Sequence, residues 1–244
     1  MSWSAQVFRY CERGLDPAFW GEPLNAITNG AFILAAIVAA IAYARQPKER
    51  SAPEVLALIA LVFVIGVGSF LFHTFATRWA GLADVIPIGI FMLAYMGYAL
   101  RAYLKLGWIL TAVGVALFIA ALQYAGTIQC RPGLISVTAA ARGPCLNGTV
   151  SYAPALVAMI GIGAVLLLKR HPAAPYLLAA GAIFFFSMLF RIVDPETCTL
   201  TTVYGRPLGT HFLWHVLNAA TLYLLLLAAV RHGRTKPHTE MYAA

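Results

Sequence analysis

Seven long apolar stretches, separated by short polar segments, divide the sequence. Each stretch approaches the ~20 residues that an α-helix needs to cross the hydrocarbon core of a bilayer. The pattern therefore predicts an all-α membrane protein, a bundle of seven transmembrane helices. The predicted helices cover residues 24–44, 55–77, 84–103, 107–125, 152–168, 174–193 and 211–230.

The composition agrees with a location in the lipid bilayer. Of the 244 residues, 61% are hydrophobic and 11% are charged, which is more apolar sequence than a soluble core of this size requires. The formal net charge of +8 would suggest nucleic acid for a soluble protein, but membrane topology accounts for it here, so we expect no nucleic-acid partner. We expect one domain over residues 1–244, with a polar N-terminal segment at 1–22 and a basic cytoplasmic tail at 231–244. The first 20 residues lack the apolar core of a cleavable signal peptide.

Basic residues distinguish the two sides of the predicted bundle. Ten lysines and arginines fall in one set of loops and in the tail, whereas the other side has six, mixed with most of the acids. Because cytoplasmic loops carry an excess of Lys and Arg, we expect the N-terminus outside and the C-terminus in the cytoplasm. The ten residues are Arg45, Lys48, Arg50, Arg101, Lys105, Lys169, Arg170, Arg231, Arg234 and Lys236.

Three of the six histidines fall inside predicted helices. His211 and His215 open the last apolar stretch, and their spacing of four residues places both imidazoles on one face of a helix. His73 lies near the end of the second predicted helix, so all three lie close to the outer boundary of the membrane. Three imidazoles with an open fourth position are typical of a catalytic zinc site. The sequence therefore predicts that His73, His211 and His215 bind Zn²⁺.

Two more polar residues fall at the same depth. Ser69 lies one helical turn before His73, and Asp84 opens the third predicted helix. Zinc lowers the pKa of a bound water towards ~7, and Asp84 would accept the proton of that water. Ser69 would donate to the oxyanion that forms when hydroxide attacks a carbonyl group. Such a set indicates a hydrolase that acts on an amide or an ester.

Each of these residues also has an ordinary structural interpretation. A single histidine in an apolar helix is commonly a hydrogen-bonded packing residue, and a pair four residues apart would also suit haem or a water-filled cavity. Ser69 follows Gly66 and Gly68, which is typical of a close contact between helices. Asp84 would serve as the N-cap of its helix. The convergence of all these residues at one membrane depth favours the metal site.

All four cysteines fall in segments that we expect outside the membrane. An even number of cysteines on an oxidising face suggests disulfides. Cys130 with Cys145 would close one loop, and Cys11 with Cys198 would join the N-terminal segment to the loop before the last helix. Other pairings and free thiols are the alternatives.

The segments that carry these residues resemble the signature of the alkaline ceramidases. That family belongs to a wider superfamily of seven-span, metal-dependent membrane hydrolases that includes the adiponectin/progestin receptors. The similar motifs are Gly68-Ser-Phe-Leu-Phe-His-Thr74, Asp84 with Pro87, His211-Phe-Leu-Trp-His215, Tyr10-Cys11-Glu12, Glu22-Pro-Leu-Asn-Ala-Ile-Thr-Asn29, and Asp194 followed by Cys198.

The resemblance implies a zinc-dependent amidase that takes ceramide, or a related N-acyl sphingolipid, from the bilayer and cleaves it to a sphingoid base and a fatty acid. It implies that the three histidines bind zinc, that Ser69 is the oxyanion donor and that Asp84 transfers the proton. Cys11 and Cys198 match cysteines that pair in family members. Because the superfamily includes receptors, the alternative is a receptor-like or lipid-binding protein with a structural zinc ion.

Animal members of the family also bind Ca²⁺ near the N-terminus. Glu12 and Glu22 match two of the carboxylates in that site, but Arg9 stands where an aspartate is expected and Gly14 where an asparagine is expected. Calcium prefers 6–8 oxygen ligands, and a cation at Arg9 opposes it, so the sequence disfavours calcium. The alternative is that Glu12 pairs with Arg9 or Arg13 and that Glu22 merely begins the first helix.

Overall fold

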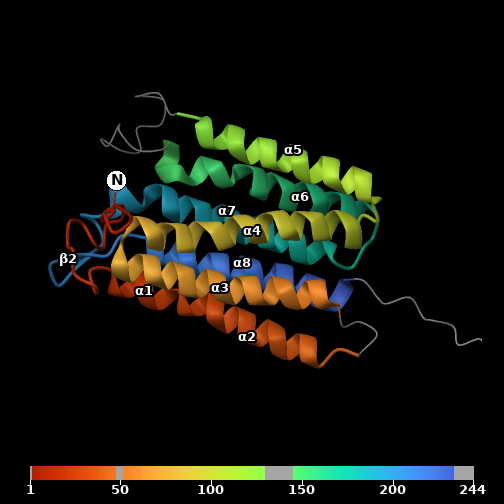
Figure 1. The fold of residues 1–244 in the computed structure, drawn as a ribbon, viewed down its shortest axis with the longest axis horizontal. Helices are drawn as coiled ribbons and strands as arrows, with labels where there is room; N and C mark the ends of the chain where they lie inside the picture. Colours follow the sequence, from red (N-terminus) through yellow and green to blue (C-terminus); the bar gives the residue numbers. More distant parts are fainter. Residues whose placement is uncertain (1, 48–51, 130–144, 234–244) are drawn as a thin grey trace, which may run out of the picture.

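In the computed structural model, the chain folds into a bundle of helices that lie side by side along the long axis of the molecule (Figure 1). The structure describes residues 2–47, 52–129 and 145–233. Within these ranges, seven helical spans are long and apolar enough to cross a membrane, as predicted. The elements are α1 (Pro23–Thr28), α2 (Gly30–Ala44), α3 (Pro53–Phe75), α4 (Arg78–Ala102), α5 (Trp108–Thr127), the 3-10 helix η2 (Cys145–Tyr152), α6 (Ala153–Leu168), α7 (Ala174–Thr197), β1 (Thr202–Val203), β2 (Arg206–Pro207) and α8 (His211–His232).

Helix α8 lies in the middle of the bundle, where it packs against α1, α2, α3 and α7. Small residues allow this close packing, since Ala35, Ala36 and Ala39 of α2 are buried in the same core as Leu225 and Leu226 of α8. The two histidines of α8 are therefore carried by the most enclosed helix of the bundle.

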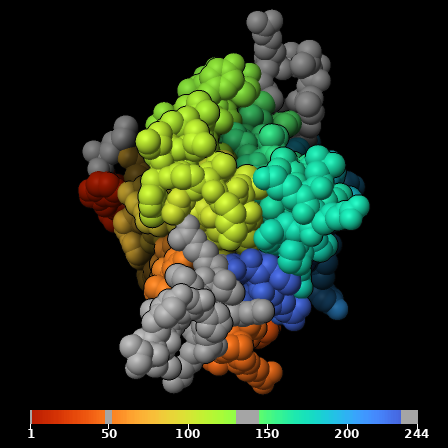
Figure 2. Space-filling view, turned by 90° about the vertical axis from the view of Figure 1, so that its right-hand side faces the viewer, coloured from red at the N-terminus to blue at the C-terminus, as the bar shows by residue number. Residues whose placement is uncertain are grey.

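Figure 2 views the bundle from the end opposite the N-terminal segment, where the α4–α5 and α6–α7 connections and the last turn of α8 come together.

Helix α4 is longer at the histidine end than the hydropathy pattern predicts. Helix α3 ends at Phe75, slightly before its predicted end at residue 77, and its C-cap residue Ala76 adopts the left-handed conformation. Helix α4 then begins at Arg78 instead of residue 84. The N-terminal segment stabilises this early start, because Ala5 accepts the backbone N–H of Arg78 and Gln6 forms a β-bridge with Thr77. Asp84 consequently lies nearly two turns inside α4, and the interpretation of Asp84 as an N-cap is wrong.

The loop predicted at residues 194–210 is shorter than expected, because α7 continues to Thr197 and the remainder forms the β1–β2 hairpin. Asp194 is fully buried in the last turn of α7. Its carboxylate accepts the backbone N–H groups of Cys11 (3.3 Å), Thr210 (2.8 Å) and His211 (3.0 Å). This carboxylate thus satisfies N–H groups at the N-terminus of α8, where the helix dipole favours a negative charge, and fixes the residue at which α8 begins.

The predicted disulfide between Cys11 and Cys198 is present, with the two Cα atoms 5.2 Å apart. It joins the N-terminal segment to the end of α7, so this segment and the hairpin close the same end of the bundle (Figure 1). Cys130 lies outside the described residues, and its pairing with Cys145 stays a prediction.

Helices α3 and α4 approach each other closely at Gly68. A Cβ atom at this position would collide with the backbone carbonyl of Ala83 and would lie 3.3 Å from the backbone nitrogen of Asp84. The glycine thus brings Ser69 on α3 next to Asp84 on α4, which makes Gly66-Val-Gly68 a helix-contact motif as well as the neighbour of a candidate catalytic residue.

We expect Gly68→Ala to lower the stability of the bundle by about 1–3 kcal/mol, because a backbone carbonyl cannot move aside as a flexible side chain can. Thermal unfolding in detergent measures the loss. The matched control is Gly89→Ala on α4, where an added Cβ meets no atom within 4 Å. Equal melting temperatures for the two variants would contradict the close contact.

Candidate metal centre

Three buried histidines meet where the ends of α3 and α8 come together. His73 comes from α3, and His211 and His215 come from α8; each is at most 2% exposed. One potential ligand atom of each ring lies within 4.8 Å of the others. The structure thus brings together the three residues that the sequence singles out as zinc ligands, across about 140 residues of chain.

Two of the imidazole rings are oriented by hydrogen bonds through Nδ1. His73 Nδ1 lies 2.5 Å from a carboxylate oxygen of Glu22, and His215 Nδ1 lies 3.0 Å from the hydroxyl of Thr28. The Thr28 hydroxyl has backbone carbonyls of Leu24 and Asn25 within hydrogen-bond distance, so it donates there and accepts from His215. Both rings therefore hold their proton on Nδ1 and leave Nε2 for a metal. This arrangement is typical of metal-ligating histidines.

The donor atoms at this site fit a zinc ion. Neutral imidazole nitrogens suit Zn²⁺, and three of them leave a fourth position for water or substrate. His211 Nδ1 and Asp84 Oδ1 are buried and have no hydrogen-bond partner among the described protein atoms. Because buried polar atoms nearly always have a hydrogen-bond partner, these two unpartnered atoms indicate that the site binds a group other than protein.

Tyr10 covers one side of the histidine cluster. Its ring stacks on that of His211, with the ring centroids 3.7 Å apart. Burial raises the pKa of Tyr10 to about 12, although the nearby Arg191 charge acts in the opposite direction. The phenol is therefore neutral at physiological pH and shields the candidate metal ligands from water.

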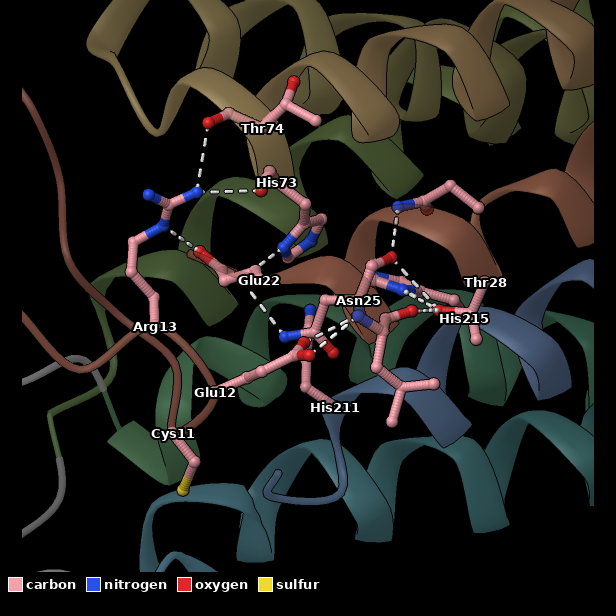
Figure 3. A network of polar contacts seen from close by, with 12 residues as sticks. Cys11, Glu12, Arg13, Glu22, Asn25, Thr28, His73, Thr74, His211 and His215 are labelled. Atoms are coloured by element: carbon pink, nitrogen blue, oxygen red, sulfur yellow. Dashed lines mark hydrogen bonds and ion pairs between the residues drawn. The ribbon is translucent and has the colours of Figure 1, made fainter. Parts of the chain in front are cut away.

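Behind His73 lies a buried ion pair between Arg13 and Glu22 (Figure 3). Arg13 Nε donates to Glu22 at 2.6 Å, and the other guanidinium N–H groups donate to main-chain carbonyls. Burial acts to raise the pKa of Glu22, but His73 and the hydrogen bonds of His73, Arg13 and Asn25 outweigh it and hold that pKa below its usual value. The carbonyl acceptors of Arg13 are Asp16 and Ala18 in its own segment and His73 and Thr74 at the end of α3.

The contacts of Glu12 and Glu22 give a calcium site no support. Glu12 accepts the backbone N–H groups of Leu24 (2.7 Å) and Asn25 (2.8 Å), and Glu22 is engaged by Arg13 and His73. The alternative pairing also needs correction, because Arg13 pairs with Glu22 and not with Glu12. Glu22 does stand at the N-cap of α1, but its side chain makes no capping hydrogen bond and contacts Arg13 and His73 instead, so it does more than begin the helix.

We expect Glu22→Gln to weaken zinc binding about 10- to 100-fold, because an amide cannot hold the Nδ1 proton of His73 as a carboxylate does. Zinc affinity by chelator competition measures the change. Glu12→Gln is the matched control, since Glu12 contacts the backbone of α1 and no histidine. Melting temperatures of the metal-stripped variants distinguish a specific loss of zinc affinity from a general loss of stability. A zinc affinity of Glu22→Gln within twofold of the parent protein would contradict the role of Glu22.

An apolar cavity extends from the histidines into the bundle. On α8 its lining reaches from His211 to Leu225, which at 1.5 Å per residue are about 21 Å apart. Ser69 and Asp84 line the same cavity as His211 and His215, so the two candidate catalytic residues face the metal site. A largely apolar cavity with a few convergent polar groups is the usual form of a ligand site.

Three residues at the site have roles there that the sequence did not predict. Arg191, which lines the cavity, falls inside the apolar stretch 174–193, where a charge is itself a signal of function. Glu22 was matched to a calcium site instead of to His73. Thr28 carries no local signal, because it is 187 residues from its partner His215 in the sequence.

The fold and the cavity define a multi-pass membrane protein whose interior ends on three buried histidines that could hold a metal ion. Comparison with known families then places the chain, since the family model Ceramidase matches residues 9–243, nearly its whole length. The chain belongs to this family, which makes it a hydrolase acting on an amide bond and is compatible with a lipid substrate. A search of the curated proteins found no match.

Proposed function

We propose that this protein is a zinc-dependent amidase that hydrolyses ceramide, or a related N-acyl sphingolipid, to a sphingoid base and a fatty acid. The observation that carries the proposal is the cluster of three buried histidines at the polar end of the cavity, with ligand atoms within 4.8 Å of one another. Membership of the Ceramidase family supports an amide as the bond that is cleaved and ceramide as the class of substrate.

In this proposal, His73, His211 and His215 would hold a Zn²⁺ ion, which would supply a Lewis acid for the substrate carbonyl and lower the pKa of a water molecule towards ~7. Ser69 donates a hydrogen bond to the carbonyl oxygen as it becomes negative. Asp84 takes a proton from the water and delivers it to the nitrogen of the departing amine. The C–O bond forms, the C–N bond breaks, and the products are a fatty acid and an amine.

The remaining lining of the cavity suits an acyl chain. Below the histidines it consists mainly of apolar and aromatic side chains, among them Phe91, Met92, Leu177 and Leu225. Such a lining excludes water from the hydrocarbon chain and strengthens electrostatic interactions at the reaction centre. The scissile amide would then lie at the boundary between the polar and the apolar lining.

We also infer that the histidine site faces the non-cytoplasmic side. The excess of basic residues at the opposite end supports this orientation, as does a disulfide between Cys11 and Cys198 at the histidine end. We expect a fluorescent protein that matures only in the cytoplasm to be bright when fused after Ala244 and dark when fused before Met1. The reverse pattern would contradict this orientation.

The test of the function is fatty-acid release from a ceramide with a labelled acyl chain by the purified protein. We expect a zinc chelator to abolish release and added Zn²⁺ to restore it, whereas Ca²⁺ added alone restores nothing. Zinc bound in equal amount to protein without hydrolysis of any N-acyl lipid would overturn the amidase and favour the receptor-like alternative.

A further inference from the structure

Arg191 places a guanidinium group in the wall of the cavity, on the last turns of α7. It lines the same space as Ser69, Asp84 and His211. The proposed hydrolysis assigns it no task, because zinc, Ser69 and Asp84 account for the hydroxide, the oxyanion and the proton. A cation at this place therefore calls for a physical explanation.

Aromatic rings hold this cation against the metal site. The guanidinium carbon lies 4.9 Å from the ring centre of Trp214, 5.6 Å from that of Tyr152 and 5.9 Å from that of Tyr10. Tyr10 in turn stacks on His211. Three ring faces offset part of the cost of removing the charge from water. They also fix the guanidinium beside one of the candidate zinc ligands.

Backbone contacts with η2 fix the position of Arg191 further. Its Nε donates to the carbonyl of Asn147 at 3.4 Å, and the side-chain amide of Asn147 donates to the carbonyl of Arg191 at 2.9 Å. Neither contact neutralises the positive charge. The arginine is thus held in place but keeps its charge available to the cavity.

No carboxylate of the described chain forms an ion pair with this cation, although Asp84 lines the same cavity and lies near enough for its charge to act on Arg191. The ion pairs there are Arg13–Glu22 and His73–Glu22. Asp194, three residues further along α7, uses its oxygens on three backbone N–H groups. The segment 130–144, which precedes Asn147 and lies outside the described ranges, contains no aspartate or glutamate. An ionised group inside a membrane protein that has no ion-pair partner is costly, and such groups commonly line the path of a ligand.

We propose that Arg191 binds a carboxylate carried by the lipid in this cavity, an inference that rests on the proposed amidase function. A guanidinium is suited to this task, because its planar N–H groups match the two oxygens of a carboxylate. The carboxylate has two possible sources. One is the released fatty acid, so that Arg191 gains its partner as the neutral amide becomes an anion. The other is an acid group on the amine half of the substrate, as in an N-acyl amino acid.

The first experiment measures binding of radiolabelled palmitate to metal-stripped protein, with unlabelled palmitate or hexadecanol as competitor. We expect palmitate to compete at least about tenfold better than hexadecanol, since an ion pair to a charged acceptor is absent for the alcohol. In Arg191→Gln the two competitors should become equal. Arg101→Gln is the matched control, because Arg101 also lies over a tryptophan ring, that of Trp108 at 4.1 Å, but does not line the cavity.

Arg191→Lys keeps the charge and loses the planar fork, so it should retain part of the preference for palmitate. This variant keeps the test decisive if Arg191→Gln fails to fold. Because the binding assay uses metal-free protein, its result does not depend on turnover. Palmitate binding through Arg191 in a protein without amidase activity would reject the proposed function and keep the carboxylate site.

The second experiment identifies the source of the carboxylate with the zinc-loaded protein. If the carboxylate belongs to the amine half, N-palmitoylglycine will have a higher kcat/KM than N-palmitoylethanolamine, and Arg191→Gln will remove this preference. If it belongs to the released acid, the neutral amide will be preferred, and palmitate will inhibit the parent enzyme more than Arg191→Gln. Equal palmitate binding by both proteins, together with unchanged ratios of kcat/KM, would overturn the proposal.

Discussion

Replacement of His215 by alanine is expected to remove the bound zinc and to reduce ceramide hydrolysis by roughly 10³-fold or more. The metal supplies several kcal/mol of charge stabilisation in the transition state, and each ~1.4 kcal/mol corresponds to a tenfold change in rate. His215 is buried, and two histidines alone leave an incomplete zinc site. Metal content per chain and fatty-acid release from the same preparation measure both effects.

The control for this substitution is His171→Ala. His171 lies in the connection between α6 and α7, at the other end of the bundle, where its ring contacts that of Tyr103. This variant should keep its zinc and its turnover. Full zinc occupancy in His215→Ala would show that the metal is bound elsewhere, and the three-histidine site would have to be abandoned.

Asp84→Asn is expected to leave the zinc in place and to lower kcat by about 10²- to 10⁴-fold, the usual contribution of general acid–base catalysis. The amide has nearly the same shape as the carboxylate but cannot accept a proton from water. Single-turnover hydrolysis and zinc content, measured together, separate this role from metal binding.

Glu196→Gln provides the matched control, because Glu196 is an exposed acid near the same end of the bundle and does not line the cavity. It should behave like the parent protein. If Asp84→Asn lost its zinc instead of its rate, Asp84 would be a metal ligand or a structural residue. If it kept both, Asp84 would have no catalytic role.

The N-terminal segment forms a structural part of the candidate metal site. Arg13 and Glu22 support His73 from behind, and Tyr10 stacks on His211 in front. The segment itself is fixed by the disulfide of Cys11. The buried guanidinium of Arg13 donates to five oxygen atoms and thus links the segment to the end of α3. Removal of either member of such a buried ion pair leaves an uncompensated charge, so the two residues stabilise the site only together.

The sequence was a good guide to the helices because long apolar stretches have one stable solution in a bilayer. It was a poorer guide to their ends at the histidine side. Arg78 and Trp79 lower the hydropathy of a segment that is nevertheless helical, since backbone hydrogen bonds to Trp3 and Ala5 hold its first turn. The early start of α4 changes the position of Asp84 from a cap to an interior residue.

The candidate metal ligands were accessible from the sequence because His211 and His215 share a helical turn and His73 lies at the same predicted depth. Their supporting contacts were not. The bonds of Glu22 to His73 and of Thr28 to His215 join residues 51 and 187 positions apart, and only the folded bundle brings them together. Arg191 was accessible in principle, as a charge within an apolar stretch.

The central claim is that His73, His211 and His215 together bind the zinc of an amidase. Zinc-edge X-ray absorption on protein that is actively hydrolysing ceramide tests it most directly. We expect one zinc per chain with three imidazole nitrogens at about 2.0–2.1 Å and one further oxygen ligand. Hydrolysis by zinc-free protein, or a zinc ion bound through sulfur, would contradict the claim.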